Sequence, residues 1–122
     1  MSDLIRNYKL KFYINASHAI RWEKGIGKQH NHTWEFICEI TTQDNHMIVF
    51  SDIEKSLENY FTKFSGMILN EVVPFDELNP TLENFAEVLF LEVSEVVKAF
   101  NANLIRIEVG ETPVRFFCIS RK

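Results

Sequence analysis

The chain has 122 residues, of which 46% are hydrophobic and 25% are charged, and its formal net charge is −4. This length and composition predict one globular domain over residues 1–122. The negative charge and the scattered basic residues argue against a nucleic-acid partner or an anionic membrane surface. No apolar run has the length of a membrane span, and residues 1–4 lack the basic and apolar blocks of a signal peptide, so we expect a cytoplasmic protein.

Two strands are predicted in the first third of the chain. Residues 5–18 alternate apolar and polar side chains, which is typical of a strand with one buried face, and residues 31–43 repeat the pattern. His18 shares the parity of the apolar set in the first strand, and His30 and His32 share it in the second. Residues 47–50 are interpreted as a short extension of the sheet after a turn at residues 43–45.

The three histidines predict a metal site. Side chains at alternate positions of a strand project to one face, so His30 and His32 can share an ion. If the loop at residues 20–29 joins two antiparallel strands, His18 lies opposite them. Three imidazoles at the margin of a core, with no fourth protein ligand evident, predict a zinc site that keeps one position open. The alternative, ordinary backbone-bonded histidines, is disfavoured for three that share a face. His46 is interpreted as a turn residue.

Two helices are predicted in the middle of the chain. Ser51 and Glu54 have the spacing of a capping box, and a helical apolar stripe continues to about residue 65. Pro80 suits the first turn of a second, more buried helix, with either Asn79 or Thr81 as its N-cap. The helices therefore follow the first pair of strands.

A second pair of strands is predicted over residues 103–111 and 114–121. Ile105, Ile107 and Val109 share the buried parity, and Glu111 shares it as well. We therefore expect Glu111 at the same end of the core as the histidines, the alternative being a solvated turn position. The order of two strands, two helices and two strands indicates an α+β fold.

The two cysteines fall within strand-like apolar segments. Cys38 lies in the second predicted strand and Cys118 in the last. In such positions a thiol usually behaves as a small buried hydrophobe. We expect both to be reduced core residues rather than a disulfide.

Taken together, these motifs resemble the 6-pyruvoyltetrahydropterin synthase family, which includes the 6-carboxytetrahydropterin synthases of queuosine biosynthesis. In chain order, the matching residues are Ala16-Ser17-His18, His30-Asn31-His32, Asp52, Leu69-Asn70, Asn79-Pro80-Thr81 and Glu111-Thr112. The resemblance implies a tunnelling fold, in which a four-stranded antiparallel sheet carries two helices on one face. In such a fold three protomers close their sheets into a β-barrel, so a homotrimer or homohexamer is expected.

The resemblance also assigns roles to site residues. It implies that His18, His30 and His32 bind Zn²⁺, and that Glu111, with Thr112 beside it, accepts hydrogen bonds from the guanidine-like edge of a pterin ring. In the family the zinc makes a C–H of the substrate side chain more acidic. The implied function is a zinc-dependent lyase of pterin or queuosine biosynthesis, acting on or binding a dihydroneopterin-triphosphate-like pterin.

The chain departs from the family where the proton-transfer residues are expected. The usual base is a cysteine four residues before the first histidine of the His-x-His pair, and here that residue is Ile26. The usual Asp-His pair before Leu-x-Asn corresponds to Ser65 and Gly66. Some relatives use a glutamate instead of the cysteine, which makes Glu23 a candidate base. A side chain without a titratable group cannot remove a proton, so the usual mechanism cannot run here unchanged.

Three functions therefore remain open. The first is an enzyme that uses zinc with another base, such as Glu23 or His46, and with loop cations meeting a triphosphate: Arg21, Lys24 and Lys28. The second is a catalytically inactive or altered paralogue that binds zinc and a pterin-like heterocycle without the usual lyase chemistry. In the third, the zinc only holds the fold together.

Overall fold

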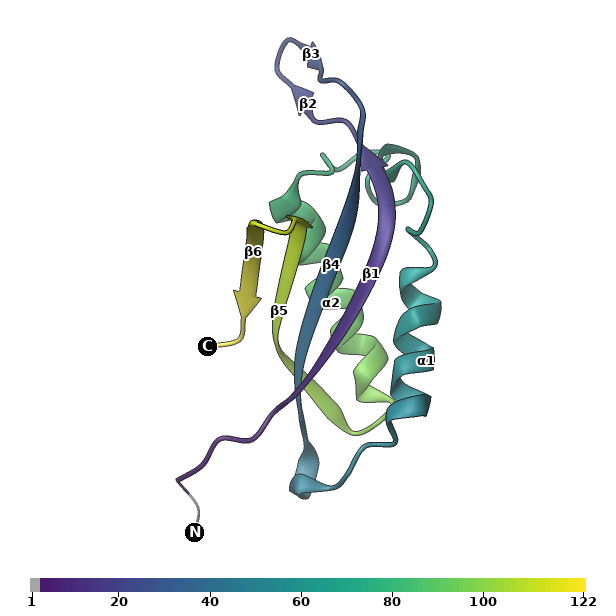
Figure 1. Cartoon of the computed structure of the whole chain (residues 1–122). Helices are drawn as coiled ribbons and strands as arrows, with labels where there is room; N and C mark the ends of the chain where they lie inside the picture. The colour runs from purple at the N-terminus through teal and green to yellow at the C-terminus, as the bar shows by residue number, and fades with distance from the viewer. Residues whose placement is uncertain (1–2) are drawn as a thin grey trace.

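The computed structural model describes residues 3–122. Its elements are β1 (Tyr8–His18), β2 (Arg21–Trp22), β3 (Gly25–Ile26), β4 (His30–Thr42), the short helix η1 (Gln43–Asn45), α1 (Phe50–Phe61), the short helix η2 (Leu69–Glu71), α2 (Leu82–Lys98), β5 (Ala102–Thr112) and β6 (Arg115–Ser120). Four strands form one antiparallel sheet in the order β1-β4-β5-β6, with both α-helices on one face (Figure 1). The α+β fold predicted from the sequence is confirmed.

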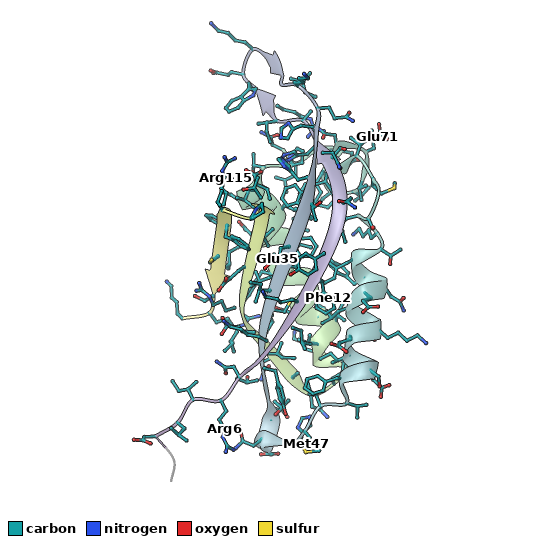
Figure 2. The ribbon with its side chains drawn as sticks, viewed as in Figure 1. Arg6, Phe12, Glu35, Met47, Glu71 and Arg115 are labelled. Atoms are coloured by element: carbon teal, nitrogen blue, oxygen red, sulfur yellow. The ribbon has the colours of Figure 1, made fainter. Side chains whose placement is uncertain are left out.

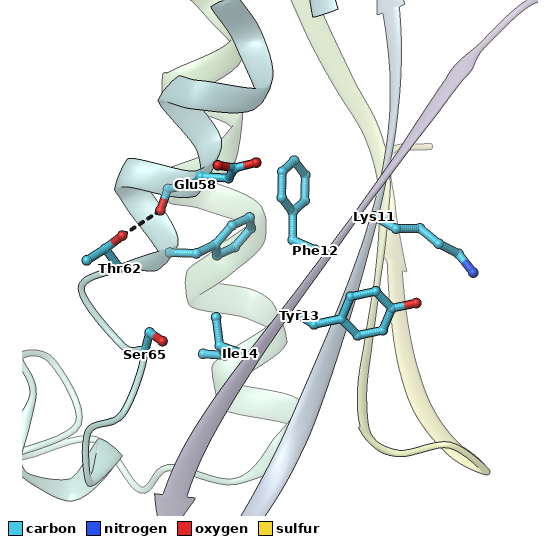
Figure 3. Close-up of a pocket in the computed structure, with 8 residues that line it drawn as sticks. Lys11, Phe12, Tyr13, Ile14, Glu58, Thr62 and Ser65 are labelled. Atoms are coloured by element: carbon cyan, nitrogen blue, oxygen red, sulfur yellow. Dashed lines mark hydrogen bonds between the residues drawn. The ribbon is translucent and has the colours of Figure 1, made fainter. Parts of the chain in front are cut away.

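The alternation of side chains in β1 and β4 places the core between the sheet and the helices. Phe12 and Ile14 point from β1 toward α1, whereas Lys11 and Tyr13 point to the opposite face of the sheet (Figure 3). In β4 the alternate residues Trp34, Phe36, Cys38 and Ile40 are buried on the helix-covered face. Antiparallel pairing sets Phe12 directly opposite Phe36, so both strands bury the same face.

Two predictions about the entry into α1 are wrong. Residues 47–49 form no strand, and Phe50 is already the first residue of the helix. The N-cap is Val49, with no side-chain hydrogen bond, so Ser51 and Glu54 do not form a capping box. Ile53 and Leu57 are fully buried, as the predicted helical stripe requires.

The predicted choice of cap for α2 is resolved in favour of Thr81. Its hydroxyl oxygen accepts a hydrogen bond of 3.1 Å from the backbone N–H of Asn84. This bond satisfies one of the amide groups that the first helical turn leaves unpaired. None of the helices in the described part of the chain combines the length and the apolar character needed to span a bilayer.

A register shift changes the buried set of β5. Ile107 and Val109 are buried as predicted, but Leu104 is buried in place of Ile105. The shift lies where Glu39 pairs with Arg106 while the next residue of β4, Ile40, pairs with Leu104. Such a β-bulge inserts one extra residue and reverses the parity beyond it.

The two cysteines differ in their environments. Cys38 is buried, and burial raises the pKa of its thiol to about 12, as expected of a core residue. The prediction that Cys118 is buried is wrong, because Cys118 is exposed. It pairs with Glu108 in the ladder and so lies on the face of the sheet opposite the helices. Both thiols are free, as predicted.

Candidate metal centre and its surroundings

The three predicted metal ligands meet at one end of the helix-covered face. His18 ends β1 and lies directly opposite His30, the first residue of β4, while His32 lies opposite Ala16. One nitrogen of each ring lies within 4.8 Å of those of the other two. His18 is only 1% exposed. The antiparallel pairing predicted from the sequence therefore brings these histidines together.

Two of the rings are oriented by backbone carbonyls. Nδ1 of His18 donates to the carbonyl oxygen of Pro80 over 2.8 Å, and Nδ1 of His30 donates to that of Lys28 over 3.0 Å. Because a carbonyl only accepts, both Nδ1 atoms carry the proton, and the Nε2 atoms of neutral rings carry lone pairs. Such outer hydrogen bonds are typical of histidines that bind metals through the other nitrogen.

The facing nitrogen atoms fit a bound cation. Nε2 of His18 and Nε2 of His30 are 3.0 Å apart, and Nε2 of His32 is buried without a hydrogen-bond partner among the described residues. Two lone pairs at this distance repel unless a proton or a metal ion lies between them, and a buried polar atom without a partner is costly. The three histidines can therefore hold a metal ion.

Electrostatics favour the neutral imidazole that a metal requires. Burial lowers the pKa of His18, an effect that the hydrogen bond from its ring to Pro80 partly opposes. Burial also lowers the pKa of His32, with Glu111 opposing the shift and the neighbouring histidines and Arg115 adding to it. Since only the neutral ring offers a lone pair, these shifts keep the site ready for a metal at neutral pH.

Trp34 packs against two of the three histidine rings. The indole of Trp34 lies edge-on to His18 and His32, with ring centroids 5.2 and 5.6 Å away. Its Nε1–H donates to the carbonyl oxygen of Ala16 over 3.1 Å. Trp34 therefore fixes the ends of β1 and β4 against each other where the histidines project.

Glu111 lies beside the three histidines, at the end of the core where the sequence predicted it. Its Oε2 is 3.8 Å from Nε2 of His18 and 3.9 Å from Nε2 of His32. Its Oε1 accepts a charged hydrogen bond of 2.9 Å from Nη1 of Arg115. Thr112 adjoins Glu111 in a pocket of about 350 Å³ that His32 also lines. A second pocket, of about 590 Å³, is lined by His18, His30 and Glu111.

The position of the usual base, Ile26, and the two candidate replacement bases, Glu23 and His46, lie away from the three histidines. Ile26 is exposed in the β2–β3 hairpin, and Glu23 lies in the exposed turn of the same hairpin. His46 is bonded to Gln43 and Phe100 at the opposite end of the sheet. Within one chain, none of these three side chains lines either pocket beside the histidines.

The other two altered positions lie along the outer edge of β1. The backbone N–H of Gly66 donates to the carbonyl oxygen of Asn15, and that of Ser17 donates to the carbonyl oxygen of Met67. Ser65 lines a groove of about 410 Å³ between β1 and α1 (Figure 3). Ser65 and Gly66 therefore lie against the edge strand of this protomer.

Two asparagines and an arginine hold the loop that follows His18, and sequence reasoning missed these roles. Asn70 exchanges two hydrogen bonds with the backbone of Ala19, and Asn79 does the same with that of Arg21. The guanidinium of Arg21 donates to three carbonyls, which belong to Asn70, Phe75 and Leu78. Asn70 and Asn79 both belong to motifs that resemble the family, and this was the sequence signal from which their roles could have been predicted. The Arg21 guanidinium is therefore held by backbone carbonyls, whereas Lys24 and Lys28 are exposed.

The comparisons with known proteins agree with this architecture. The structure of 6-pyruvoyl tetrahydropterin synthase from Caenorhabditis elegans superposes with a TM-score of 0.78 at 17% identity, covering 96% of each chain. The enzyme from Plasmodium falciparum gives 0.69 at 12% identity over 94% of this chain and 98% of its own. A catalytic-residue mutant of the Plasmodium vivax enzyme, with glutamate changed to alanine, gives 0.66 at 14% identity over 97% and 99%. Identities this low establish the fold alone.

The family itself is established by sequence. No curated protein matches the chain. However, a model of the 6-pyruvoyl tetrahydropterin synthase family matches residues 7–122, which is nearly the whole chain. The matched region contains the complete sheet, both helices, the three histidines and Glu111. The chain therefore belongs to the 6-pyruvoyl tetrahydropterin synthase family.

Proposed function

We propose that the chain binds zinc through His18, His30 and His32 and holds a pterin of the dihydroneopterin-triphosphate type against Glu111 and Thr112. The observation that carries this proposal is the set of converging imidazole nitrogens with the Glu111 carboxylate 3.8 and 3.9 Å from two of them. Three imidazoles with an open fourth position suit zinc. Family membership supports a pterin as the ligand class.

The chain's own residues supply binding and orientation. The Glu111 carboxylate has two oxygens that can accept from adjacent N–H groups of a ring edge, and charge-assisted bonds of this kind fix orientation. The carbonyls of Pro80 and Lys28 keep two of the imidazoles directed at the shared position. When bound, the metal would polarise a hydroxyl or carbonyl of the ligand side chain and make a neighbouring C–H more acidic.

The proton step separates two versions of this function. Ile26, Ser65 and Gly66 carry no group that takes a proton at neutral pH, which favours a paralogue that binds zinc and a pterin without the usual lyase chemistry. The enzyme alternative is supported by the Plasmodium vivax relative, whose catalytic residue is a glutamate. In this chain Glu23 is the corresponding candidate, and the flexible backbone at Gly25 would have to bring it inward.

We expect the zinc-loaded protein to bind neopterin in titration calorimetry. The Glu111→Gln variant should bind neopterin at least about 100-fold more weakly, because an uncharged amide forms no charge-assisted hydrogen bonds and has only one acceptor oxygen. Glu108→Gln, on the other face of the sheet, is the matched control. Absence of neopterin binding by the wild-type protein would refute the proposed ligand. Incubation with dihydroneopterin triphosphate, followed by mass spectrometry, tests catalysis. A product that Glu23→Gln abolishes would establish the enzyme version.

We also propose that the chain forms a homotrimer or homohexamer. β1 and β6 are the edge strands of the sheet, and exposed edges invite pairing with another copy. The sheet face opposite the helices carries Lys11, Glu35 and Arg106, which suits a polar barrel interior. Light scattering on the eluted protein should give three or six times the 14.3 kDa of one chain. A monomeric mass would contradict this proposal.

A further inference from the structure

Arg115 is the first residue of β6 and reaches Glu111, whose carboxylate lies beside His18 and His32. Its Nη1 donates to Oε1 of Glu111 over 2.9 Å. The Arg115 side chain is 65% exposed and that of Glu111 is 12% exposed. Figure 2 shows Arg115 at the end of the sheet that faces the β2–β3 hairpin. It lines the same pocket as His18, His30 and Glu111.

The Arg115 guanidinium and the proposed ligand offer Glu111 the same kind of donor. A guanidinium presents N–H groups in a planar fork that matches a carboxylate. The 2-amino-4-oxo edge of a pterin presents an exocyclic N–H beside a ring N–H in a similar plane. Oε1 of Glu111 is already held by Arg115, and Oε2 faces His18 and His32. Oε1 is therefore hydrogen-bonded before a ring edge arrives, whereas Oε2 has no hydrogen bond among the described residues.

We propose that Arg115 occupies Oε1 of the Glu111 carboxylate in the free protein and must be displaced by the ring edge of the ligand. This inference rests on the proposed pterin function of the same site. The guanidinium and a ring edge compete for the same oxygen, so Arg115 lowers the affinity for any ring that binds Glu111 through this edge. The exposed arginine can turn into solvent once it is displaced, because no other hydrogen bond of its guanidinium is found among residues 3–122.

Removing Arg115 should therefore strengthen pterin binding. We expect Arg115→Ala to bind 6-hydroxymethylpterin about fivefold more tightly than the wild-type protein, since exposed ion pairs contribute up to about 1 kcal/mol. Binding of 6-hydroxymethyllumazine, which must displace the same single bond, should improve by about the same factor, because the cost of displacing Arg115 is common to both rings. The preference for pterin over lumazine should therefore stay unchanged in the variant. Titration calorimetry on the zinc-loaded full chain measures both affinities.

Arg106→Ala is the matched control. Arg106 is also a strand arginine paired with carboxylates, those of Glu39 and Glu108, but it lies on the other face of the sheet. Its variant should bind both rings as the wild-type protein does. Arg115→Lys should bind both rings nearly as weakly as the wild-type protein does, since an ammonium still occupies the carboxylate. Circular dichroism confirms that each variant is folded.

The outcomes distinguish the inference from the function on which it rests. If the wild-type protein binds the pterin but Arg115→Ala binds it equally or more weakly, Arg115 does not compete for Glu111, and the inference fails while the proposed function stands. If neither protein binds either ring, the proposed pterin function fails, and the inference fails with it.

Discussion

Replacing His18 by alanine is expected to lower the affinity for zinc by more than about 100-fold, because loss of an outer-shell partner alone typically costs 10- to 100-fold. His18 is the buried member of the set, and its Nε2 faces those of the other two ligands. Two remaining imidazoles on alternate positions of one strand cannot surround an ion. Competition with a chromophoric chelator at fixed pH measures the affinity.

Two further histidine variants separate metal binding from folding. His30→Ala removes a ligand that is exposed, so it should lose zinc affinity with little effect on the metal-free protein. His18→Ala should also destabilise the metal-free protein by about 1–3 kcal/mol, because the carbonyl of Pro80 loses its buried donor. His46→Ala, at the opposite end of the sheet, should keep full zinc affinity. Wild-type affinity in His18→Ala would show that the three histidines are not the metal site.

The position of the candidate metal site was predictable because it depends mainly on strand parity. His18, His30 and His32 follow the alternation of long strands whose neighbours are strongly apolar, and a one-residue slip would expose every core side chain. The pairing of His18 with His30 then follows from the loop between the strands. Glu111 was placed at the correct end of the core for the same reason.

The errors in prediction arise where local pattern and tertiary packing disagree. The Ser51–Glu54 spacing resembles a capping box, but α1 begins at Phe50, so Ser51 lies inside the helix and cannot be its N-cap. Because of the bulge in β5, Leu104 is buried instead of Ile105, and no glycine or proline at this point of the sequence predicts the bulge. Cys118 lies in an edge strand, where apolar neighbours do not ensure burial. In each case the deciding contact comes from a distant segment.

The contact between Arg115 and Glu111 was not predictable from the sequence, because it depends on the geometry of the turn between β5 and β6. The hairpin between β5 and β6 has a register shift between Gly110 and Thr112, which brings Arg115 back toward Glu111. In the same turn Gly110 permits the close approach of the Phe116 ring, since a Cβ there would lie 2.5 Å from it. An arginine four residues after a glutamate on a strand hairpin would otherwise be interpreted as a solvated surface residue.

Trp34 connects the candidate metal site to the core. Its replacement by alanine should lower the free energy of unfolding more than any of the histidine substitutions does. Its side chain is 0% exposed and packs edge-on against Phe85, with ring centroids 4.9 Å apart, as well as against His18 and His32. Loss of a buried aromatic side chain leaves a cavity and typically costs 3–5 kcal/mol, and here the carbonyl of Ala16 also loses a donor. We expect the free energy of unfolding of the metal-free protein to fall by about 4 kcal/mol, measured by urea denaturation.

Trp22 provides the matched comparison for this loss, and zinc provides a second measurement. Trp22 is 69% exposed in the β2–β3 hairpin, so Trp22→Ala should change the free energy of unfolding by less than about 0.5 kcal/mol. Trp34→Phe should fall between the two, because it keeps most of the ring but leaves the Ala16 carbonyl without its donor. Since Trp34 also supports His18 and His32, zinc affinity should fall in Trp34→Ala and stay unchanged in Trp22→Ala. A loss below about 1 kcal/mol in Trp34→Ala would show that the indole does not tie the histidines to the core.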